Sequence, residues 1–256
     1  MVTRAIRKVA ERKNPESRRR QRGPRPAKAT GAPPIEAARL LRPLPRPRTI
    51  AEEVAERIIL AIANGEQQPG ERLTEEGLAE VMDVSRVPAR EALHYLEAIG
   101  IVVPLRRRGL RIIDFSPQQA REINEVRLGL ESIAVKNIME LVRQDPARLK
   151  PLDAILSDMH SLVQSADAIA LALADVAFHR EIMTLSGNPF LLKFWEGLAP
   201  HLVIIFCRDW HADRRKVAQV ALHRRLRQLI ARGDPEDIET VLIDHFGSPV
   251  SKAAGR

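Results

Sequence analysis

The chain has 256 residues, of which 45% are hydrophobic, so it is long enough for one large or two modest domains with a packed core. Its single cysteine, Cys207, excludes an internal disulfide framework and any metal site built from several cysteines. The sequence lacks the run of ~18 apolar residues that a membrane helix needs and the apolar segment of a signal peptide, which predicts a cytoplasmic protein without a membrane partner.

The formal net charge of +8 is concentrated at the N-terminus. Residues 1–48 contain 15 Lys or Arg residues, 3 Asp or Glu residues and eight of the 18 prolines, so the rest of the chain is slightly acidic. Such a segment cannot bury enough apolar surface to order itself, which predicts a disordered basic tail over residues 1–48. The tail could add sequence-independent affinity for nucleic acid, or it could be a solvating extension or the product of a start codon placed too far upstream.

Residues 49–115 predict three helices followed by a β-hairpin. The first helix, TIAEEVAERIILAIANGE, carries an apolar stripe at helical spacing, made of Ile50, Val54, Ile58 and Ile62. The second, TEEGLAEVMDV, is short and capped by Thr74, and the third begins at SRVPARE with Ser85 as its cap. Two short strands, 101–103 and 110–113, then flank a basic turn. This order of elements is typical of a winged helix-turn-helix.

The third helix carries two cations at its N-terminal end, because Arg86 and Arg90 are four residues apart and share a face. Arginines at this end of a recognition helix contact guanine edges and phosphates, and Val87 between them could touch a thymine methyl group. The turn between the strands would approach phosphates or the minor groove through Arg106, Arg107, Arg108 and Gly109. A charged helix end can also be a merely solvated surface, but these features together favour double-stranded DNA as the partner.

The segment PGERLTEEGLAEVMDVSRVPAREALHYLEAIGIV resembles the GntR family of bacterial transcription factors over about residues 50–113. The matching residues are Pro69, Gly70, Leu73, Leu78, Ala79, Val84, Ser85, Arg86, Pro88, Arg90, Glu91, Ala92, Leu93, Leu96, Glu97 and Gly100. The resemblance implies a homodimer on a palindromic operator, commonly as a repressor. It also implies DNA contacts from Arg86, Val87, Arg90 and the residues near Gly109, with which we group Ser85.

Two positions depart from that family's pattern. Some members have an Arg that touches DNA where this chain has Glu76, so no such contact is expected here. Asp83 replaces the Gly that is usual in the turn, which predicts slight backbone strain.

Residues 116–247 predict a helical bundle, and residues 248–256 a flexible tail. Ser116, Pro117 and Gln119 form a capping box at the start of the first helix, while Gly187 and Gly233 stand where helices should stop. The expected helices span 117–142, 146–164, 167–185, 189–210, 214–232 and 235–246. The predicted fold is therefore mainly α, a winged helix-turn-helix followed by an all-α bundle.

Four polar residues of the bundle lie in apolar helical rows and are expected to point inward: Asp175, His179, His223 and His245. A buried carboxylate needs a strong partner. Three imidazoles and one carboxylate suit a divalent transition metal, although a core histidine more often only donates or accepts a hydrogen bond.

The segments EVRLGLE, DVAFHREIMTLSGNPFL and ALHRRLRQLIARGDPEDIETVLIDHF resemble the FCD effector domain of one large GntR subfamily, over about residues 117–246. The resemblance implies that Asp175, His179, His223 and His245 bind a metal, often zinc, nickel or manganese. Leu222 stands where the family commonly has Glu before the third ligand.

Arg127 falls between apolar residues on a helical row, so it either pairs with Glu131 one turn on or faces a cavity and binds a carboxylate ligand. The FCD resemblance favours the second role. Ser186 and Asn188 follow the metal-bearing helix, and Asn188 is an effector-binding candidate, although both could merely cap the next helix.

These observations predict a transcriptional regulator in which a small organic acid binds the metal and Arg127 and so alters operator binding. Two alternatives remain open at this point. One is a metal-dependent hydrolase with an accessory DNA-binding module, against which the sequence offers no convincing general base beside the ligands. The other is a metal-free bundle that serves only dimerisation.

Overall fold

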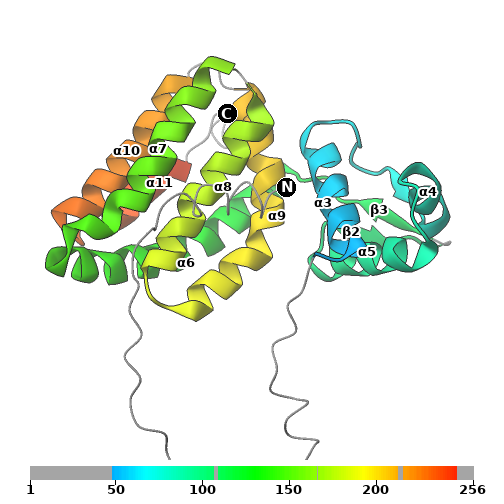
Figure 1. Ribbon diagram of the computed structural model, residues 1–256, viewed down its shortest axis with the longest axis horizontal. Helices are drawn as coiled ribbons and strands as arrows, with labels where there is room; N and C mark the ends of the chain where they lie inside the picture. Colours follow the sequence, from blue (N-terminus) through cyan, green and yellow to red (C-terminus); the bar gives the residue numbers. More distant parts are fainter. Residues whose placement is uncertain (1–47, 107–108, 166, 213–215, 247–256) are drawn as a thin grey trace, which may run out of the picture.

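The computed structural model describes residues 48–106, 109–165, 167–212 and 216–246 and arranges them in two lobes (Figure 1). The smaller lobe holds the elements from α3 to β3, and the larger lobe holds those from α6 to α11. The predicted tails at 1–48, apart from Arg48, and at 248–256 lie outside the described residues, as do Arg107 and Arg108.

The smaller lobe has the predicted order of three helices and a hairpin, with one additional strand. Its elements are α3 (Ile50–Ala63), β1 (Arg72–Leu73), α4 (Glu75–Val81), α5 (Arg86–Ala98), β2 (Val102–Pro104) and β3 (Leu110–Ile112). Thr49 caps α3 in a capping box with Glu52, and the Thr74 hydroxyl accepts from the Gly77 N–H at the start of α4. These hydrogen bonds satisfy backbone donors that a helix leaves free at its N-terminus.

The strand β1 was not predicted, because its two residues carry no alternating pattern. It pairs antiparallel with β3, and the sheet order is β1-β3-β2. Gly109 enters β3 with φ +105°, and a Cβ there would lie 3.0 Å from the Leu73 carbonyl oxygen and 2.9 Å from Arg72 Nε. Glycine is therefore required at this position by the backbone angle and by the close approach of β1.

Three local details of this lobe refine the predictions. Ile50 is 57% exposed, so the buried part of the predicted stripe begins at Val54. Ser85 occupies the N-cap position of α5, but its side chain makes no capping hydrogen bond, which corrects the expected cap. Asp83 has φ +52°, the left-handed conformation that the missing turn glycine predicted.

The larger lobe is all helical, and its helix boundaries agree with the predicted ones to within about four residues. The elements are α6 (Pro117–Gln144), η1 (Pro146–Leu149), α7 (Lys150–Leu162), η2 (Val163–Ser165), α8 (Ala168–Leu185), α9 (Pro189–Ala212), α10 (Lys216–Arg232) and α11 (Ile238–Phe246). The capping box of Ser116 and Gln119 opens α6 as predicted. Gly187 and Gly233 have positive φ after α8 and α10, where glycine ends a helix at little steric cost.

Helix α9 is the structural centre of the protein. It packs extensively on α8 and also contacts α3, so it joins the two lobes. At this joint, Arg208 Nη1 donates to the carbonyl oxygen of Phe115, the residue just before the cap of α6, at 2.8 Å. By length and composition α9 is apolar enough to cross a membrane, but half of its most apolar window is buried inside the protein, as in the core helix of a globular fold. Charged residues and a proline interrupt the apolar residues of α9, so the sequence contains no continuous apolar run there.

Candidate functional site

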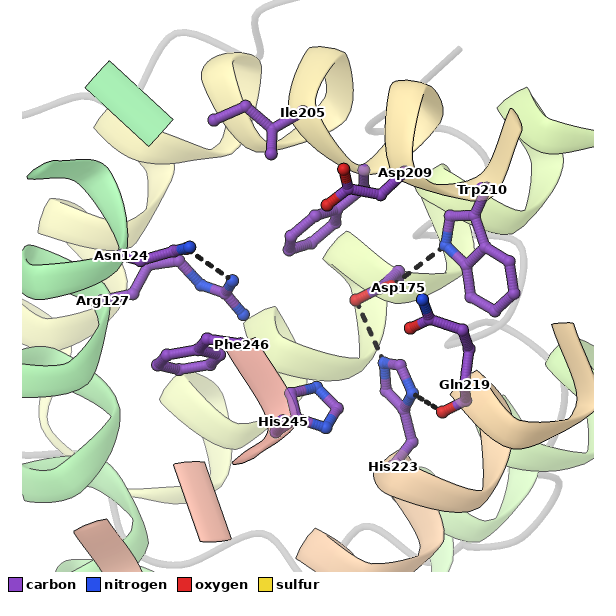
Figure 2. A pocket seen from close by; sticks show the side chains of 11 residues that line it. Asn124, Arg127, Asp175, Ile205, Asp209, Trp210, Gln219, His223, His245 and Phe246 are labelled. Carbon is purple, nitrogen blue, oxygen red and sulfur yellow. Dashed lines mark hydrogen bonds and ion pairs between the residues drawn. The ribbon is translucent and has the colours of Figure 1, made fainter. Parts of the chain in front are cut away.

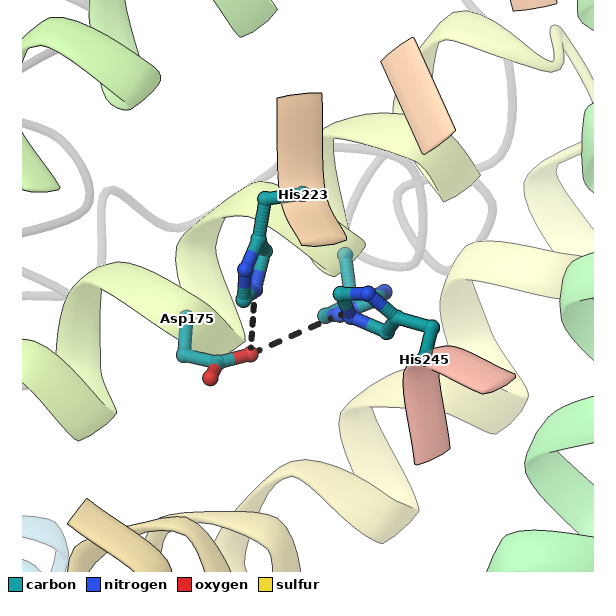
Figure 3. A group of neighbouring side chains, drawn as sticks. Asp175, His223 and His245 are labelled. Atoms are coloured by element: carbon teal, nitrogen blue, oxygen red, sulfur yellow. Dashed lines mark hydrogen bonds and ion pairs between the residues drawn. The ribbon is translucent and has the colours of Figure 1, made fainter. Parts of the chain in front are cut away.

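Four side chains from three helices meet at the centre of the larger lobe (Figure 3). Asp175 and His179 come from α8, His223 from α10 and His245 from α11, and their potential ligand atoms all lie within 4.8 Å of one another. Asp175 Oδ1 is 3.1 Å from His223 Nε2 and 3.4 Å from His179 Nε2. The two Nε2 atoms of His179 and His245 are 2.9 Å apart.

Helical spacing and burial explain this convergence. Because Asp175 and His179 are one turn apart on α8, their side chains project from the same face. Phe178 packs edge-on against the rings of His179 and His223 and encloses that side of the cluster. Asp175, His179 and His223 are buried, and His245 is partly exposed. The sequence prediction that all four point inward is thus matched by the geometry.

Three of the four candidate ligands form hydrogen bonds through the atoms that face away from the cluster. The Nδ1 of His179 lies 2.7 Å from Glu131 Oε2, and the Nδ1 of His223 lies 2.9 Å from the Gln219 carbonyl oxygen. With the proton on Nδ1 in each ring, the Nε2 lone pair faces the centre of the cluster. Trp210 Nε1 donates to Asp175 Oδ2 at 3.1 Å, which leaves Oδ1 directed inward. Hydrogen bonds of this kind orient the ligands of metal sites.

The electrostatics favour the protonation states that metal binding needs at two of these groups. Burial raises the pKa of Asp175, but His223 and His179 together bring that pKa well below its ordinary value, so the group is a carboxylate. Burial and repulsion from His223 and His179 lower the pKa of His245, so its ring is neutral. For His179, burial acts to lower the pKa, but Glu131 and Asp175 outweigh it and raise the pKa.

The residues present therefore fit a divalent metal ion. Two imidazole nitrogens at 2.9 Å repel each other when both present lone pairs, and a shared cation removes that repulsion. Three neutral imidazoles and one carboxylate are the donor set that zinc and related ions prefer. The Nδ1 of His245 is buried without a hydrogen-bond partner among the described residues, so this ring is the least constrained of the three.

Arg127 of α6 forms the ion pair with Glu131 and also lines a cavity, so the two positions that the sequence left open are compatible (Figure 2). Its Nε donates to Glu131 Oε1 at 3.2 Å, which is the i,i+4 ion pair, and both side chains are almost fully buried. Its guanidinium also lines a cavity shared with Asp175, His223 and His245, and stacks over the Phe246 ring at 3.9 Å. The Nη2 atom is buried and has no hydrogen-bond partner among the described residues.

The cavity beside the cluster is small and mostly polar. Its volume is about 30 Å³, and its remaining described lining residues are Asn124, Ile205, Phe206, Asp209, Trp210, Gln219 and Phe246. A space of this size holds one or two water molecules, so a larger ligand would require side chains to move. The Asn124 side-chain oxygen accepts from Arg127 Nη1 at 3.2 Å and helps to fix the guanidinium.

Asn188 does not line this cavity, in contrast to the sequence expectation. Its Oδ1 accepts from the Phe190 N–H at 3.0 Å in the first turn of α9, and its own N–H donates to the Ser186 hydroxyl. Both residues therefore stabilise the turn between α8 and α9, and the capping alternative describes them better than an effector-binding role.

Several residues around the cluster were missed as site residues. Glu131 was considered only as the partner of Arg127, but it also holds His179 on another helix. Helical spacing could have identified some of them. Asn124 and Glu131 lie three and four residues from Arg127, and Gln219 lies four residues from His223. The positions of Asp209 and Trp210 carried none, because they depend on how α9 packs against α8.

Of the predicted DNA-contacting residues that the structure describes, those on α5 and Arg106 are exposed, and Gly109 is half-buried. Side chains of Arg86 and Arg90 are 66% and 55% exposed, Val87 is 61% exposed, and Ser85 and Arg106 are exposed. Both arginines pair with the first turn of α4: Arg90 Nε and Nη2 each donate to a Glu75 oxygen at 2.9 Å, and Arg86 lies 3.5 Å from Glu76. The exposed arginines were predicted from the sequence, whereas these ion pairs were not.

Family models match both lobes of the chain. Residues 50–112 match the model for bacterial regulatory proteins of the gntR family, and residues 122–248 match the model for the FCD domain. The two matched segments follow the division between the smaller and the larger lobe.

Curated relatives and solved structures agree with these matches. An uncharacterised HTH-type transcriptional regulator of Bacillus subtilis (strain 168) is 28% identical, covering 72% of this chain and 82% of its own. The gluconate operon transcriptional repressor of the same organism is 31% identical over 57% of this chain and 59% of its own. Among solved structures, E. coli McbR/YncC has a TM-score of 0.65 at 21% identity, covering 78% of this chain and 94% of its own. A GntR-type regulator from Rhodococcus sp. RHA1 gives the same TM-score and identity over 80% and 97%.

Proposed function

This chain belongs to the GntR family of bacterial transcriptional regulators and carries an FCD domain, and from that premise we propose that it is a repressor controlled by a small organic acid bound beside a divalent metal. Its relatives are transcriptional regulators, and like them it is a DNA-binding regulator and not an enzyme. The hydrolase alternative is therefore set aside. Two relatives named as repressors, of the gluconate operon and probably of a D-xylose utilization operon, support the repressor sense.

The observation that carries the proposal is the convergence of Asp175, His179, His223 and His245, whose potential ligand atoms all lie within 4.8 Å of one another. In the proposal these four residues hold zinc, nickel or manganese, and Glu131 and the Gln219 carbonyl fix two of the rings. The bound ion would supply positive charge toward an acidic ligand.

Arg127 provides the second attraction for an organic acid. Its Nη2 group is buried and has no hydrogen-bond partner in the part of the chain that the structure describes. A buried donor that lacks a partner destabilises the protein until a ligand accepts its hydrogen bond. Contacts with the rings of Phe206 and Phe246 keep the guanidinium in place. A carboxylate that enters the cavity would accept from this group.

The DNA-binding half of the proposal rests on the exposed end of α5. Arg86, Val87 and Arg90 would contact bases and phosphates in the major groove, with Ser85 at the helix start and Arg106 to Gly109 at the hairpin. A palindromic operator requires two copies of this helix, so we propose a homodimer that acts in the cytoplasm.

The two sites are linked through α9. Phe206 and Trp210 of this helix line the cavity, and Arg208 between them donates to the Phe115 carbonyl at the start of the connection to the smaller lobe. An acid that binds one arrangement of the lobes better than the other would shift their equilibrium and thereby change operator binding.

The test combines metal analysis with operator binding. We expect the purified parent to retain about one zinc, nickel or manganese ion per chain, and Asp175→Ala and His245→Ala to lose it, while His160→Ala, at an exposed position, retains it. Small carboxylates should weaken operator binding by the metal-loaded parent and not by Asp175→Ala. Equal metal content in the parent and in both site variants would favour a metal-free bundle that serves dimerisation.

A further inference from the structure

The outer face of α6 carries a stripe of exposed residues with an apolar centre. Its members follow one another at alternating steps of four and three residues, so they share one face of the helix, and all are exposed: Glu122, Val126, Gly129, Ile133 and Lys136. Val126 and Ile133 are 52% and 49% exposed. A Cβ added at Gly129, between them, would meet nothing within 4 Å. The described residues therefore leave this face of the helix open.

Gly129 distinguishes the stripe from a chance pair of exposed apolar residues, which are common on soluble proteins. A glycine in the exposed middle of a helix lowers helix stability by roughly 1 kcal/mol relative to alanine. The distance between two packed helices depends on the side chains at their contact, so a glycine there lets a second helix come close. Contact with another helix at Gly129 would offset the cost of the glycine.

The charges at the two ends of the stripe complement each other across a two-fold axis. Glu122 lies seven residues before Gly129, and Lys136 lies seven residues after it. If two copies of α6 cross antiparallel at Gly129, Glu122 of each copy comes level with Lys136 of the other, about 10 Å along the axis from the crossing point. Val126 and Ile133, three and four residues from the glycine, then come level in the same way. A parallel crossing would instead place like charges opposite each other.

We propose that two copies of this chain meet at the α6 stripe, antiparallel and related by a two-fold axis at Gly129. The contact is isologous, so each favourable pair of residues forms twice. This assignment rests on the homodimer of the proposed function and adds the surface that forms it. The opposite face of α6 carries the buried side chains of Arg127 and Glu131, so the proposed effector cavity lies one helix away from the second copy.

Charge reversal tests the antiparallel crossing. Sedimentation equilibrium of the full-length protein measures the dissociation constant of the dimer. Glu122→Lys alone, or Lys136→Glu alone, places like charges opposite each other at both ends of the contact and should raise the dissociation constant ~10-fold or more. The double variant with both substitutions restores opposite charges and should return to within about three-fold of the parent.

Gly129→Leu tests the close approach of the two helices. Because the added side chain enters open space and leucine favours a helix over glycine, the variant should keep the helical content of the parent in circular dichroism. The two leucines would hold the helices apart and should raise the dissociation constant at least ~10-fold. Ala154→Leu, which adds the same side chain at an exposed position of α7, should leave it unchanged.

A dimer that Gly129→Leu leaves as tight as the parent, or that the double charge reversal fails to restore, would overturn the α6 assignment and leave the proposed homodimer intact. The next candidate surface is on α9, where Phe190 and Phe194 are 68% and 63% exposed. Loss of the dimer in Phe194→Ser, with no change in Gly129→Leu, would place the interface there instead. If the parent sediments as a monomer at every concentration at which it is soluble, the α6 assignment and the proposed homodimer fall together.

Discussion

Carboxylates pair with cationic groups in two regions of this protein, and the two regions differ chiefly in their access to water. At the tip of α5, Glu75 pairs with Arg90 and Glu76 with Arg86, and at least a third of each of these side chains is exposed. At the centre of the bundle, Glu131 joins Arg127 and His179 with side chains that are at most 3% exposed.

The difference shows how one type of contact serves two purposes. Exposed ion pairs are screened by water and salt, so their partners separate easily and can be exchanged for DNA phosphates. A buried pair is costly to break, because the remaining charge has no water to solvate it, so it holds a fixed geometry. We therefore expect substitutions at the centre to act on stability and those at the tip to act on DNA binding.

The largest effect is expected from Glu131→Ala. The substitution leaves Arg127 without its Glu131 partner and removes the hydrogen bond that orients His179. Breaking a buried ion pair by removing one partner typically destabilises a protein by ~3–5 kcal/mol, and we expect a loss of this size in the free energy of unfolding. Urea denaturation, followed by circular dichroism, measures it.

Glu140→Ala provides the matched control on the same helix. Glu140 pairs with Arg143 at 3.1 Å, but the side chains are 60% and 67% exposed, so its removal should change stability by less than ~1 kcal/mol. Glu131→Gln keeps an acceptor for His179, so its loss in the free energy of unfolding should lie between those of Glu131→Ala and Glu140→Ala. Similar urea midpoints for Glu131→Ala and Glu140→Ala would mean that burial does not make the Glu131 pair more important for stability than the exposed Glu140 pair.

The second-largest effect, a loss of operator affinity, is expected from Arg90→Ala. Removing this exposed cation should weaken operator binding by ~5- to 100-fold, the loss that follows from one arginine contact to a base or phosphate, without lowering the unfolding temperature. Fluorescence anisotropy with an operator duplex measures the affinity. Arg225→Ala is the control, since Arg225 forms a comparably exposed pair with Asp244 on the bundle. Operator affinity that is equal in both variants would remove α5 from the DNA interface.

Much of this architecture was predictable because it follows from local sequence rules. Apolar periodicity located the helices, and capping residues such as Ser116 and glycines such as Gly187 located their ends. The cluster was predictable in part because Asp175, His179, His223 and His245 each lie in an apolar helical row, and the family resemblance added the expectation that the four bind a metal.

The remaining features depend on packing between segments distant in sequence. Strand β1 forms because it pairs with β3, and its two residues are too few to carry a pattern that predicts this pairing. Glu131 lies 48 positions from His179, and Asp175 lies 35 from Trp210, so only the assembled bundle brings these partners together. Asn188 was placed in the effector site by its neighbourhood in sequence, but its side chain caps α9.

The smallest effect, and the sharpest probe of the exposed region, is expected from Glu75→Gln. The Glu75 carboxylate accepts two hydrogen bonds from Arg90, which lower the pKa of Glu75 and keep it charged. Binding to a phosphate requires Arg90 to leave this partner. Without the negative charge at position 75, Arg90 should turn to DNA more readily and raise the affinity for non-operator duplex by about two- to five-fold.

The salt dependence distinguishes this mechanism from a general change in charge. If Glu75 competes with phosphate for Arg90, the gain in Glu75→Gln should be largest at low salt and should disappear in the double variant Glu75→Gln with Arg90→Ala. Glu71→Gln, which removes a charge from the same lobe at a residue preceding β1, should have a smaller effect. A gain that persists without Arg90 would show that Glu75 repels DNA directly. The exposed pair of Glu75 and Arg90 would then have no role in DNA binding, in contrast to the buried pair of Glu131 and Arg127, which lies at the proposed site.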